Sequence, residues 1–83
     1  MITILFFASF RERLGVASER LSLNGPTNVG SVLTNLRNRG GIWHETFAEG
    51  QTVMMAVNQE IADTSTTVND GDELAFFPPV TGG

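Results

Sequence analysis

The chain has 83 residues, of which 41% are hydrophobic and 17% are charged, and it has a formal net charge of −4 with five arginines and no lysine. This length is typical of one domain, and the acidic balance argues against binding to nucleic acid, which depends on clustered cations. The sequence contains no cysteine, which excludes disulfides and thiolate chemistry, and no apolar run approaches the roughly 18 residues of a membrane span, so we expect one cytoplasmic domain, residues 1–83.

The N-terminal segment predicts a strand, a short helix and a second strand. Residues 2–7 are rich in β-branched and aromatic residues, which is typical of a strand, and Thr3 is the one polar member. Because side chains alternate between the two faces of a strand, Phe7 shares the outward face with Thr3. Residues 9–14 predict a short helix that stops at a glycine, and residues 20–23 alternate as the next strand.

The main helix is predicted to begin after Thr27, with that residue as its N-cap. Apolar residues then recur at i, i+3, i+4 and i+7, which is the pattern of one helical face. These residues are Val29, Val32, Leu33 and Leu36. Gly40-Gly41 is predicted to end the helix, and residues 43–48 predict a further helical turn.

The second half of the chain predicts strands at residues 53–57 and 73–77. The first is followed by an Asn58-Gln59 turn, and the second is preceded by the turn sequence Asn-Asp-Gly-Asp. The order of elements is strand, short helix, strand, long helix and two or three strands. This order predicts an α+β fold, in which one main helix packs on one face of a mixed sheet.

The other face of the predicted sheet has no helix to cover it. If Glu73 points outward, alternation turns Phe77 outward too, so that it shares this uncovered face with Phe7. Large exposed apolar side chains often mark a partner site. We therefore interpret this face as a binding surface, with cover by small loops as the alternative.

Residues that could catalyse a reaction or bind a metal are few. His44, the single histidine, has no second ligand nearby in the sequence, and Asp70 and Asp72 lack the remaining ligands of a calcium loop. Glu45 and Glu49 are four residues apart, as in some acid–base pairs, but no nucleophile accompanies them. The glycines form no phosphate-binding motif. We therefore expect this chain to bind no cofactor and no metal.

The last six residues, 78–83, predict a flexible tail that projects from the domain. Its prolines have a fixed φ angle, and its final two glycines have no side chain and can enter a slot that excludes other residues. At about 3.3–3.6 Å per residue, the tail could reach about 20 Å into a partner. The alternative interpretation is a terminus that merely frays.

Four segments together resemble the small subunits of molybdopterin synthase, a family of ubiquitin-like sulfur carriers. The segments are Ile4–Ala8, Ala56–Gln59, Asp70–Glu73 and the octet Phe76–Gly83. The octet is the most specific of them, because many ubiquitin-like proteins end in Gly-Gly but few have Phe-Phe-Pro-Pro-Val-Thr before it. The resemblance extends over essentially the whole chain and implies a ubiquitin-like β-grasp fold.

The resemblance also implies a function for the tail. In this family, a ubiquitin-activating-like adenylyltransferase uses ATP to adenylate the terminal glycine, which corresponds to Gly83 and follows Gly82. A persulfide donor protein then supplies sulfur to give a thiocarboxylate. The tail inserts into the large subunit of a heterotetramer and donates this sulfur to the pyranopterin precursor of the molybdenum cofactor. The chain would therefore be a sulfur-donating subunit that is not itself catalytic.

By similarity, the uncovered face and the tail bind the partners. The implied contact residues are Phe7, Ile61, Phe77, Pro78, Pro79, Val80 and Thr81. Alternation places Phe7 and Phe77 independently, whereas Ile61 depends mainly on the family pattern. Three alternatives stay open: a sulfur carrier for the thiazole of thiamine, a carrier for tRNA thiolation, and a ubiquitin-like modifier of other proteins.

Overall fold

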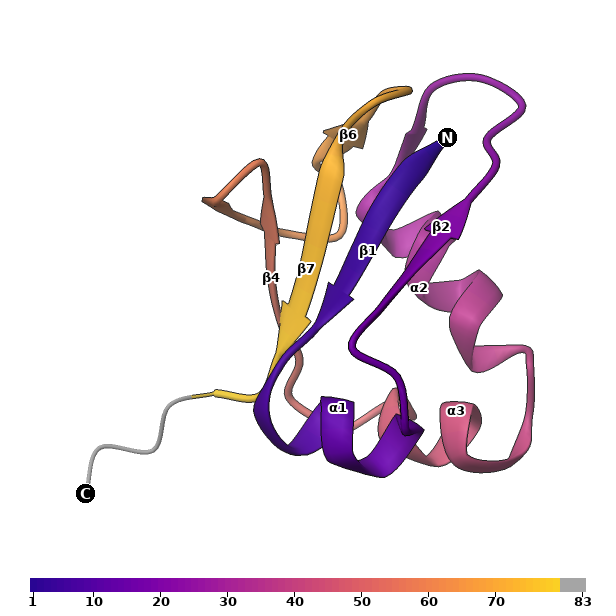
Figure 1. Cartoon of the computed structure of the whole chain (residues 1–83), viewed down its shortest axis with the longest axis vertical. Coiled ribbons are helices and arrows are strands. Elements are labelled where there is room, and N and C mark those ends of the chain that lie inside the picture. The colour runs from indigo at the N-terminus through magenta and orange to yellow at the C-terminus, as the bar shows by residue number, and fades with distance from the viewer. Residues whose placement is uncertain (80–83) are drawn as a thin grey trace.

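The computed structural model describes residues 1–79, which form a curved sheet with helices on one side and at one end (Figure 1). Its elements are β1 (Ile2–Phe6), α1 (Ala8–Leu14), β2 (Ser18–Leu21), β3 (Thr27–Asn28), α2 (Val29–Arg37), α3 (Gly41–Thr46), β4 (Met54–Val57), β5 (Glu60–Ala62), β6 (Thr67–Val68) and β7 (Glu73–Phe77). The main sheet has the order β2-β1-β7-β4-β5, in which β1 and β7 are parallel and the other neighbours are antiparallel. Strands β3 and β6 form a separate antiparallel pair.

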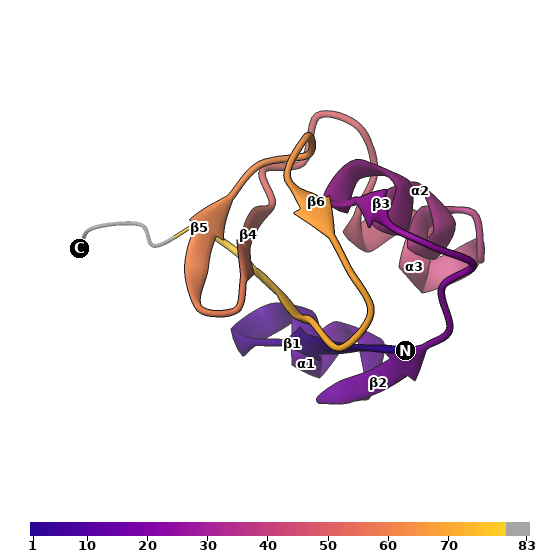
Figure 2. The same ribbon diagram turned by 90° about the horizontal axis from the view of Figure 1, so that it is seen from above.

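Helix α2 lies on the concave side of the main sheet (Figure 2). The four residues of its predicted apolar stripe are all buried, together with the inward side chains of β1 and β7. The alternation predicted for β1 is correct, since Ile2, Ile4 and Phe6 are at most 1% exposed. One helix on one face of a mixed sheet is the predicted α+β arrangement. Among residues 1–79, no helix has the length and apolar content needed to cross a membrane.

An aromatic cluster fixes the end of the sheet at which β7 finishes. The Phe47 ring, just after α3, has its centroid 5.5 Å from that of Phe10 in α1 and 5.6 Å from that of Phe76 in β7. The Phe6 ring of β1 packs edge-on against the Trp43 ring, with 5.5 Å between the ring centroids. Such pairs contribute about 0.5–1.5 kcal/mol beyond the area they bury. The cluster therefore holds α1 and α3 against the strand ends from which Pro78 continues.

The start of α2 differs by one residue from the prediction. The N-cap is Asn28, whose side-chain oxygen accepts a hydrogen bond from the Ser31 backbone N–H at 2.8 Å. Thr27 instead pairs with Val68 in the β3–β6 ladder. The sequence did not indicate this ladder, because strands of two residues are too short to show alternation.

The predicted end of α2 at Gly40-Gly41 is also wrong. The helix ends at Arg37, with Asn38 as its C-cap, and Gly40 precedes α3 with a φ of 77°. Only glycine adopts such an angle without a steric cost. Gly40 therefore lies between the two helices, and α3 begins at Gly41, two residues earlier than the predicted turn at 43–48.

An ion pair ties the segment between these helices to the edge strand β2. The Arg39 guanidinium donates to both carboxylate oxygens of Glu19, at 2.7 and 2.6 Å, and lies 4.5 Å from the centre of the Trp43 ring. The hydrogen bonds from Arg39 to Glu19 raise the pKa of Arg39 above its ordinary value. This bidentate geometry fixes β2 relative to the helices.

A buried hydroxyl offers a route to a more stable variant. Thr46 is 1% exposed, and within the described residues its Oγ1 has no hydrogen-bond partner. Thr46→Val keeps the shape of the side chain and removes the hydroxyl, so we expect the free energy of unfolding in urea to rise by about 1 kcal/mol. Thr67→Val, at an exposed position of β6, is the control and should change it little. A lower free energy of unfolding for Thr46→Val than for the wild type would show that the hydroxyl has a partner, such as a buried water.

Two aspartates, the exposed Asp63 and the partly buried Asp72, should make the fold sensitive to acid. The Asn69 backbone N–H and then the Asn58 side chain lower the pKa of Asp72, and the Ser65 hydroxyl and backbone N–H lower the pKa of Asp63. The unfolded chain therefore protonates these groups first. Their stabilisation is complete above the unfolded pKa of about 3.9 and is lost as the pH falls through the lower folded values.

We expect the free energy of unfolding, measured by urea titration at each pH, to be lower at about pH 3 than at about pH 6, with the loss concentrated near and below the unfolded pKa. Asp72→Asn removes one of these two carboxyls. Its free energy of unfolding should therefore decrease less on acidification than that of the wild type. Equal acid sensitivity of the two proteins would contradict a role of Asp72.

Candidate functional site

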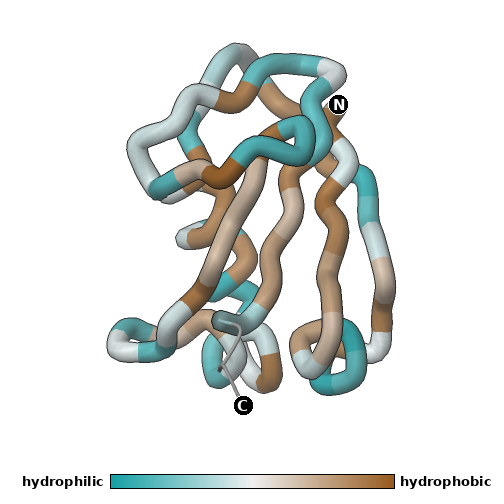
Figure 3. The backbone as a smooth tube through the Cα atoms, turned by 90° about the vertical axis from the view of Figure 1, so that its left-hand side faces the viewer, coloured by the Kyte–Doolittle hydropathy of each residue, from teal (hydrophilic) through white to brown (hydrophobic). Residues whose placement is uncertain are grey.

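The convex face of the main sheet, opposite α2, presents an apolar surface. Figure 3 looks onto this side, where strands lie in front and no helix covers them. We call the surface the outer face and define it by seven residues: Leu5, Phe7, Met54, Ala56, Ile61, Ala75 and Phe77. Paired residues of neighbouring strands point to the same face, so the strand register shows how these side chains are arranged.

Two rows of side chains cross the outer face. In the first, Ala75 pairs with Leu5 on one side and with Ala56 on the other, and Ala56 pairs with Ile61. In the second row, Phe77 pairs with Met54. Phe7 extends this second row, because the preceding residues of β1 and β7 are paired. The large side chains therefore lie around two short alanines.

The three predicted contact residues of the domain all lie on this face. Phe7 is 46% exposed and Ile61 is 72% exposed, whereas Phe77 is partly buried. Sequence reasoning missed the other members, although alternation from Phe77 could have identified Ala75, and alternation from Phe7 could have identified Leu5. The positions fit a binding surface, and the binding role of each residue stays a prediction.

A backbone turn sets the position of Phe7. β1 ends at Phe6, one residue earlier than predicted, and Ala8 has a φ of 53° in the left-handed region. The Phe7 backbone N–H nevertheless still donates to the Phe76 carbonyl, at 3.2 Å. Phe7 is thereby held beside the last residues of β7 while the chain turns into α1.

The tail begins directly at the outer face. Pro78 is partly buried and Pro79 is exposed, and both follow immediately after Phe77. The predictions for Val80, Thr81, Gly82 and Gly83 lie outside the described residues. The predicted tail thus starts at the end of the second apolar row.

The remaining candidates from the sequence do not form a catalytic site. His44, Glu45 and Glu49 are exposed, and the turn residues Asp70 and Asp72 lie in another part of the fold. Among residues 1–79, no group of three or more His, Asp or Glu side chains is arranged to hold a metal ion. The candidate site within the described residues is therefore the apolar outer face.

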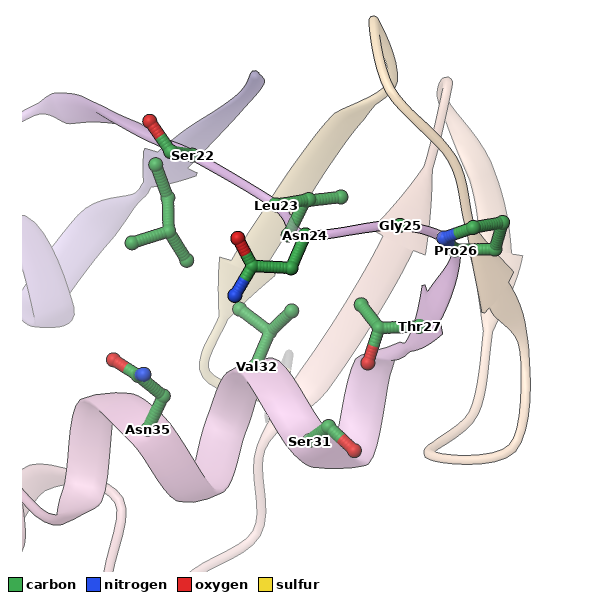
Figure 4. A pocket seen from close by; sticks show the side chains of 10 residues that line it. Ser22, Leu23, Asn24, Gly25, Pro26, Thr27, Ser31, Val32 and Asn35 are labelled. Atoms are coloured by element: carbon green, nitrogen blue, oxygen red, sulfur yellow. The ribbon is translucent and has the colours of Figure 1, made fainter.

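A pocket of about 370 Å³ lies on the helix side of the fold, between the β2–β3 connection and α2 (Figure 4). Its lining includes Ser22 and Asn24 from the connection, Thr27 from β3, and Ser31 and Asn35 from α2. No side chain that lines it is titratable near neutral pH. It offers short, uncharged polar groups but no side-chain acid or base.

Comparison with known proteins identifies the family. The family model described as the ThiS family matches residues 4–83. The chain belongs to the ThiS family. This ThiS-family chain is 39% identical to the molybdopterin synthase sulfur carrier subunit of Haemophilus influenzae and 37% identical to that of Escherichia coli, in each case over 83 residues and 100% of both chains.

A solved structure supports the fold of this ThiS-family chain. Small archaeal modifier protein 1 of Haloferax volcanii superimposes with a TM-score of 0.78 and 27% identity, covering 95% of this chain and 97% of that one. The β-grasp fold implied by the sequence resemblance is therefore confirmed.

Proposed function

We propose that this chain is the sulfur carrier subunit of molybdopterin synthase. The observation that carries the proposal is its similarity, at 39% and 37% identity over their full lengths, to two proteins of that name. The geometry is consistent with it, because an apolar face adjoins the strand end from which the tail continues. A carrier needs both features: a surface that docks and an arm that reaches a reactive centre.

The reactive group in this proposal is the carboxylate of Gly83. A terminal carboxylate, with a reference pKa of about 3.3–3.7, is ionised at neutral pH and is a poor electrophile. An activating enzyme would join it to the α-phosphorus of ATP and release pyrophosphate. Attack by a donor persulfide on the acyl carbon would release AMP and leave an acyl disulfide. A second thiol of the donor protein would then attack the donor's own sulfur in that S–S bond, which releases the thiocarboxylate and leaves a disulfide on the donor. This route brings sulfur to a chain that has no cysteine.

The large subunit of the synthase is the proposed recipient of the charged tail. The outer face would dock against it, and residues 78–83 would extend into its active site. Since the chain has only five basic side chains, the large subunit would supply the cations that position an anionic precursor. Each dithiolene product needs two sulfur atoms, so two charged chains would be consumed per product, as in a heterotetramer. We propose that this ATP-dependent cycle takes place in the cytoplasm.

Mass spectrometry of the intact chain tests the proposal. The chain is incubated with a molybdopterin synthase adenylyltransferase, ATP and a persulfide donor. We expect its mass to increase by the difference between one sulfur and one oxygen atom, and we expect no increase without ATP. An unchanged mass in the complete reaction would contradict the sulfur carrier function.

A protein modifier is the second candidate, because the chain shares its fold with a small archaeal modifier protein at 27% identity. In that case, the Gly83 acyl group would be transferred to lysine amines of other proteins. Digestion of proteins from the native host distinguishes the two functions: a modifier leaves lysines joined by an isopeptide bond to a branched peptide that ends in Gly82-Gly83, and a carrier leaves thiocarboxylate alone. The names of the full-length relatives favour molybdopterin over thiazole synthesis or tRNA thiolation as the destination of the sulfur.

A further inference from the structure

Two turns lie against each other at the end of the main sheet opposite the tail. One is the Asn58-Gln59 turn between β4 and β5, and the other includes Asp72 and leads into β7 at Glu73. Both belong to segments on which the family resemblance depends, yet neither is on the outer face. Their contact is made mainly by Asn58.

Asn58 extends the pairing of β4 with β7 by one residue. Its backbone N–H donates to the Glu73 carbonyl at 2.8 Å, and its side-chain Oδ1 accepts from the Glu73 backbone N–H at 3.0 Å. Two opposite residues of an antiparallel ladder normally exchange both of these bonds through backbone atoms. Because the backbone of Asn58 turns away with a φ of 50°, its side-chain oxygen replaces the carbonyl.

The amide nitrogen of Asn58 makes a third bond. Its Nδ2 donates to Oδ1 of Asp72 at 3.0 Å, while Oδ2 of Asp72 accepts from the Asn69 backbone N–H at 2.8 Å. Asn58 therefore binds a backbone N–H, a backbone carbonyl and a carboxylate together. An aspartate in its place would lose the donor and bring a second negative charge against Asp72.

The turn geometry also favours asparagine. Asn58 and Gln59 have φ angles of 50° and 70°, and a two-residue turn with positive φ at both positions is the type I′ hairpin turn. Asparagine is one of the few residues with a side chain that adopts this region readily. A glycine would keep the backbone turn and remove all the side-chain bonds.

The hairpin carries Ile61, the most exposed of the large outer-face residues at 72%. Ile61 lies in β5, an edge strand of three residues that pairs only with β4 within the described sheet. Its place on the outer face therefore depends on how firmly the hairpin is held to β7. The Asn58 contacts are the hydrogen bonds that join the hairpin tip to β7.

We propose that Asn58 is a positioning residue, which holds the β4–β5 hairpin in register with β7 and so fixes Ile61 relative to Phe77 on the docking surface. The docking part of this inference rests on the proposed function. The positioning of the hairpin does not, and it can be measured on the chain alone.

Amide hydrogen exchange of the free chain tests the positioning. Asn58→Gly keeps the turn but removes the side-chain acceptor, so we expect exchange of the Glu73 amide to become about threefold to tenfold faster. Gln59→Gly is the matched control: among the hydrogen bonds of residues 1–79 none involves the Gln59 side chain, and its positive φ suits glycine. Exchange of the Glu73 amide should be unchanged or slower in this control. Equal exchange in Asn58→Gly and the wild type would overturn the proposal.

Binding to a molybdopterin synthase large subunit tests the consequence for docking. We expect Asn58→Gly to raise the dissociation constant about threefold to tenfold, and Gln59→Gly to leave it unchanged. If Asn58 acts through Ile61, then Asn58→Gly in an Ile61→Ala background should have a smaller effect than in the wild type. Equal effects in both backgrounds would show that Asn58 does not act through Ile61. A wild-type chain that fails to bind would contradict the docking function instead, while the exchange result would still decide whether Asn58 holds the hairpin.

Discussion

Deletion of Gly83 should abolish thiocarboxylate formation and leave the folded domain intact. The elements of the fold and its buried core lie within residues 2–77, so the deletion removes none of the residues that form them. It moves the terminal carboxylate back by about 3.3–3.6 Å along the tail. A displacement of about 1 Å can already reduce the rate of a positioned reaction about 100-fold. The activating enzyme would then hold ATP out of reach of the carboxylate.

The measurement is mass spectrometry of the intact chain after incubation with the adenylyltransferase, ATP and the persulfide donor, together with its thermal unfolding. The truncated chain should unfold at the wild-type temperature and show no added sulfur. Gly83→Ala is the matched variant, because it keeps the length and adds one methyl group, which a narrow slot would exclude. Asn24→Ala, in the β2–β3 connection, should acquire sulfur as the wild type does. Sulfur loading of the truncated chain at the wild-type rate would disprove the proposed role of Gly83.

The parts of the fold that follow from local pattern could be predicted from the sequence. The apolar stripe of α2 from Val29 to Leu36 is a clear signal in the sequence, because the helix buries one face. The alternation in β1 and β7 is clear for the same reason. The β3–β6 pair could not be predicted. Thr27 and Val68 are 41 positions apart in the sequence and pair only because the folded chain brings two extended residues of each segment together.

The candidate site, too, could be predicted only as far as it depends on local sequence pattern. Alternation of side chains alone predicts that Phe7 and Phe77 lie on the same face of the sheet. The neighbours of Phe77 depend on register, since only the pairing of β7 with β4 puts Met54 beside it, and only the pairing of β4 with β5 puts Ile61 beside Ala56. The contact of Asn58 with Glu73 also depends on that register. A turn residue can show its preference for positive φ in the sequence, but it cannot show its partner.

Replacement of Phe77 by glutamate should weaken docking to the large subunit more than any other single change on the outer face. Phe77 pairs with Met54, lies beside Phe7 and immediately precedes the tail, so an interface that admits the tail would bury it. An unpaired charge buried there costs about 3–5 kcal/mol, which corresponds to at least a 100-fold rise in the dissociation constant. Isothermal titration calorimetry of the uncharged carrier with a purified large subunit measures this change.

Two controls separate loss of the interface from loss of the fold. Phe77→Leu keeps an apolar side chain at the same position, so its dissociation constant should stay within about tenfold of the wild-type value. Thr67→Glu introduces the same charge at an exposed position of β6, outside the outer face, and should leave binding unchanged. Phe77 is only partly buried in the free chain, so Phe77→Glu should still unfold cooperatively. If a cooperatively folded Phe77→Glu chain binds with the wild-type dissociation constant, Phe77 is not in the interface, and the tail must be delivered by another surface.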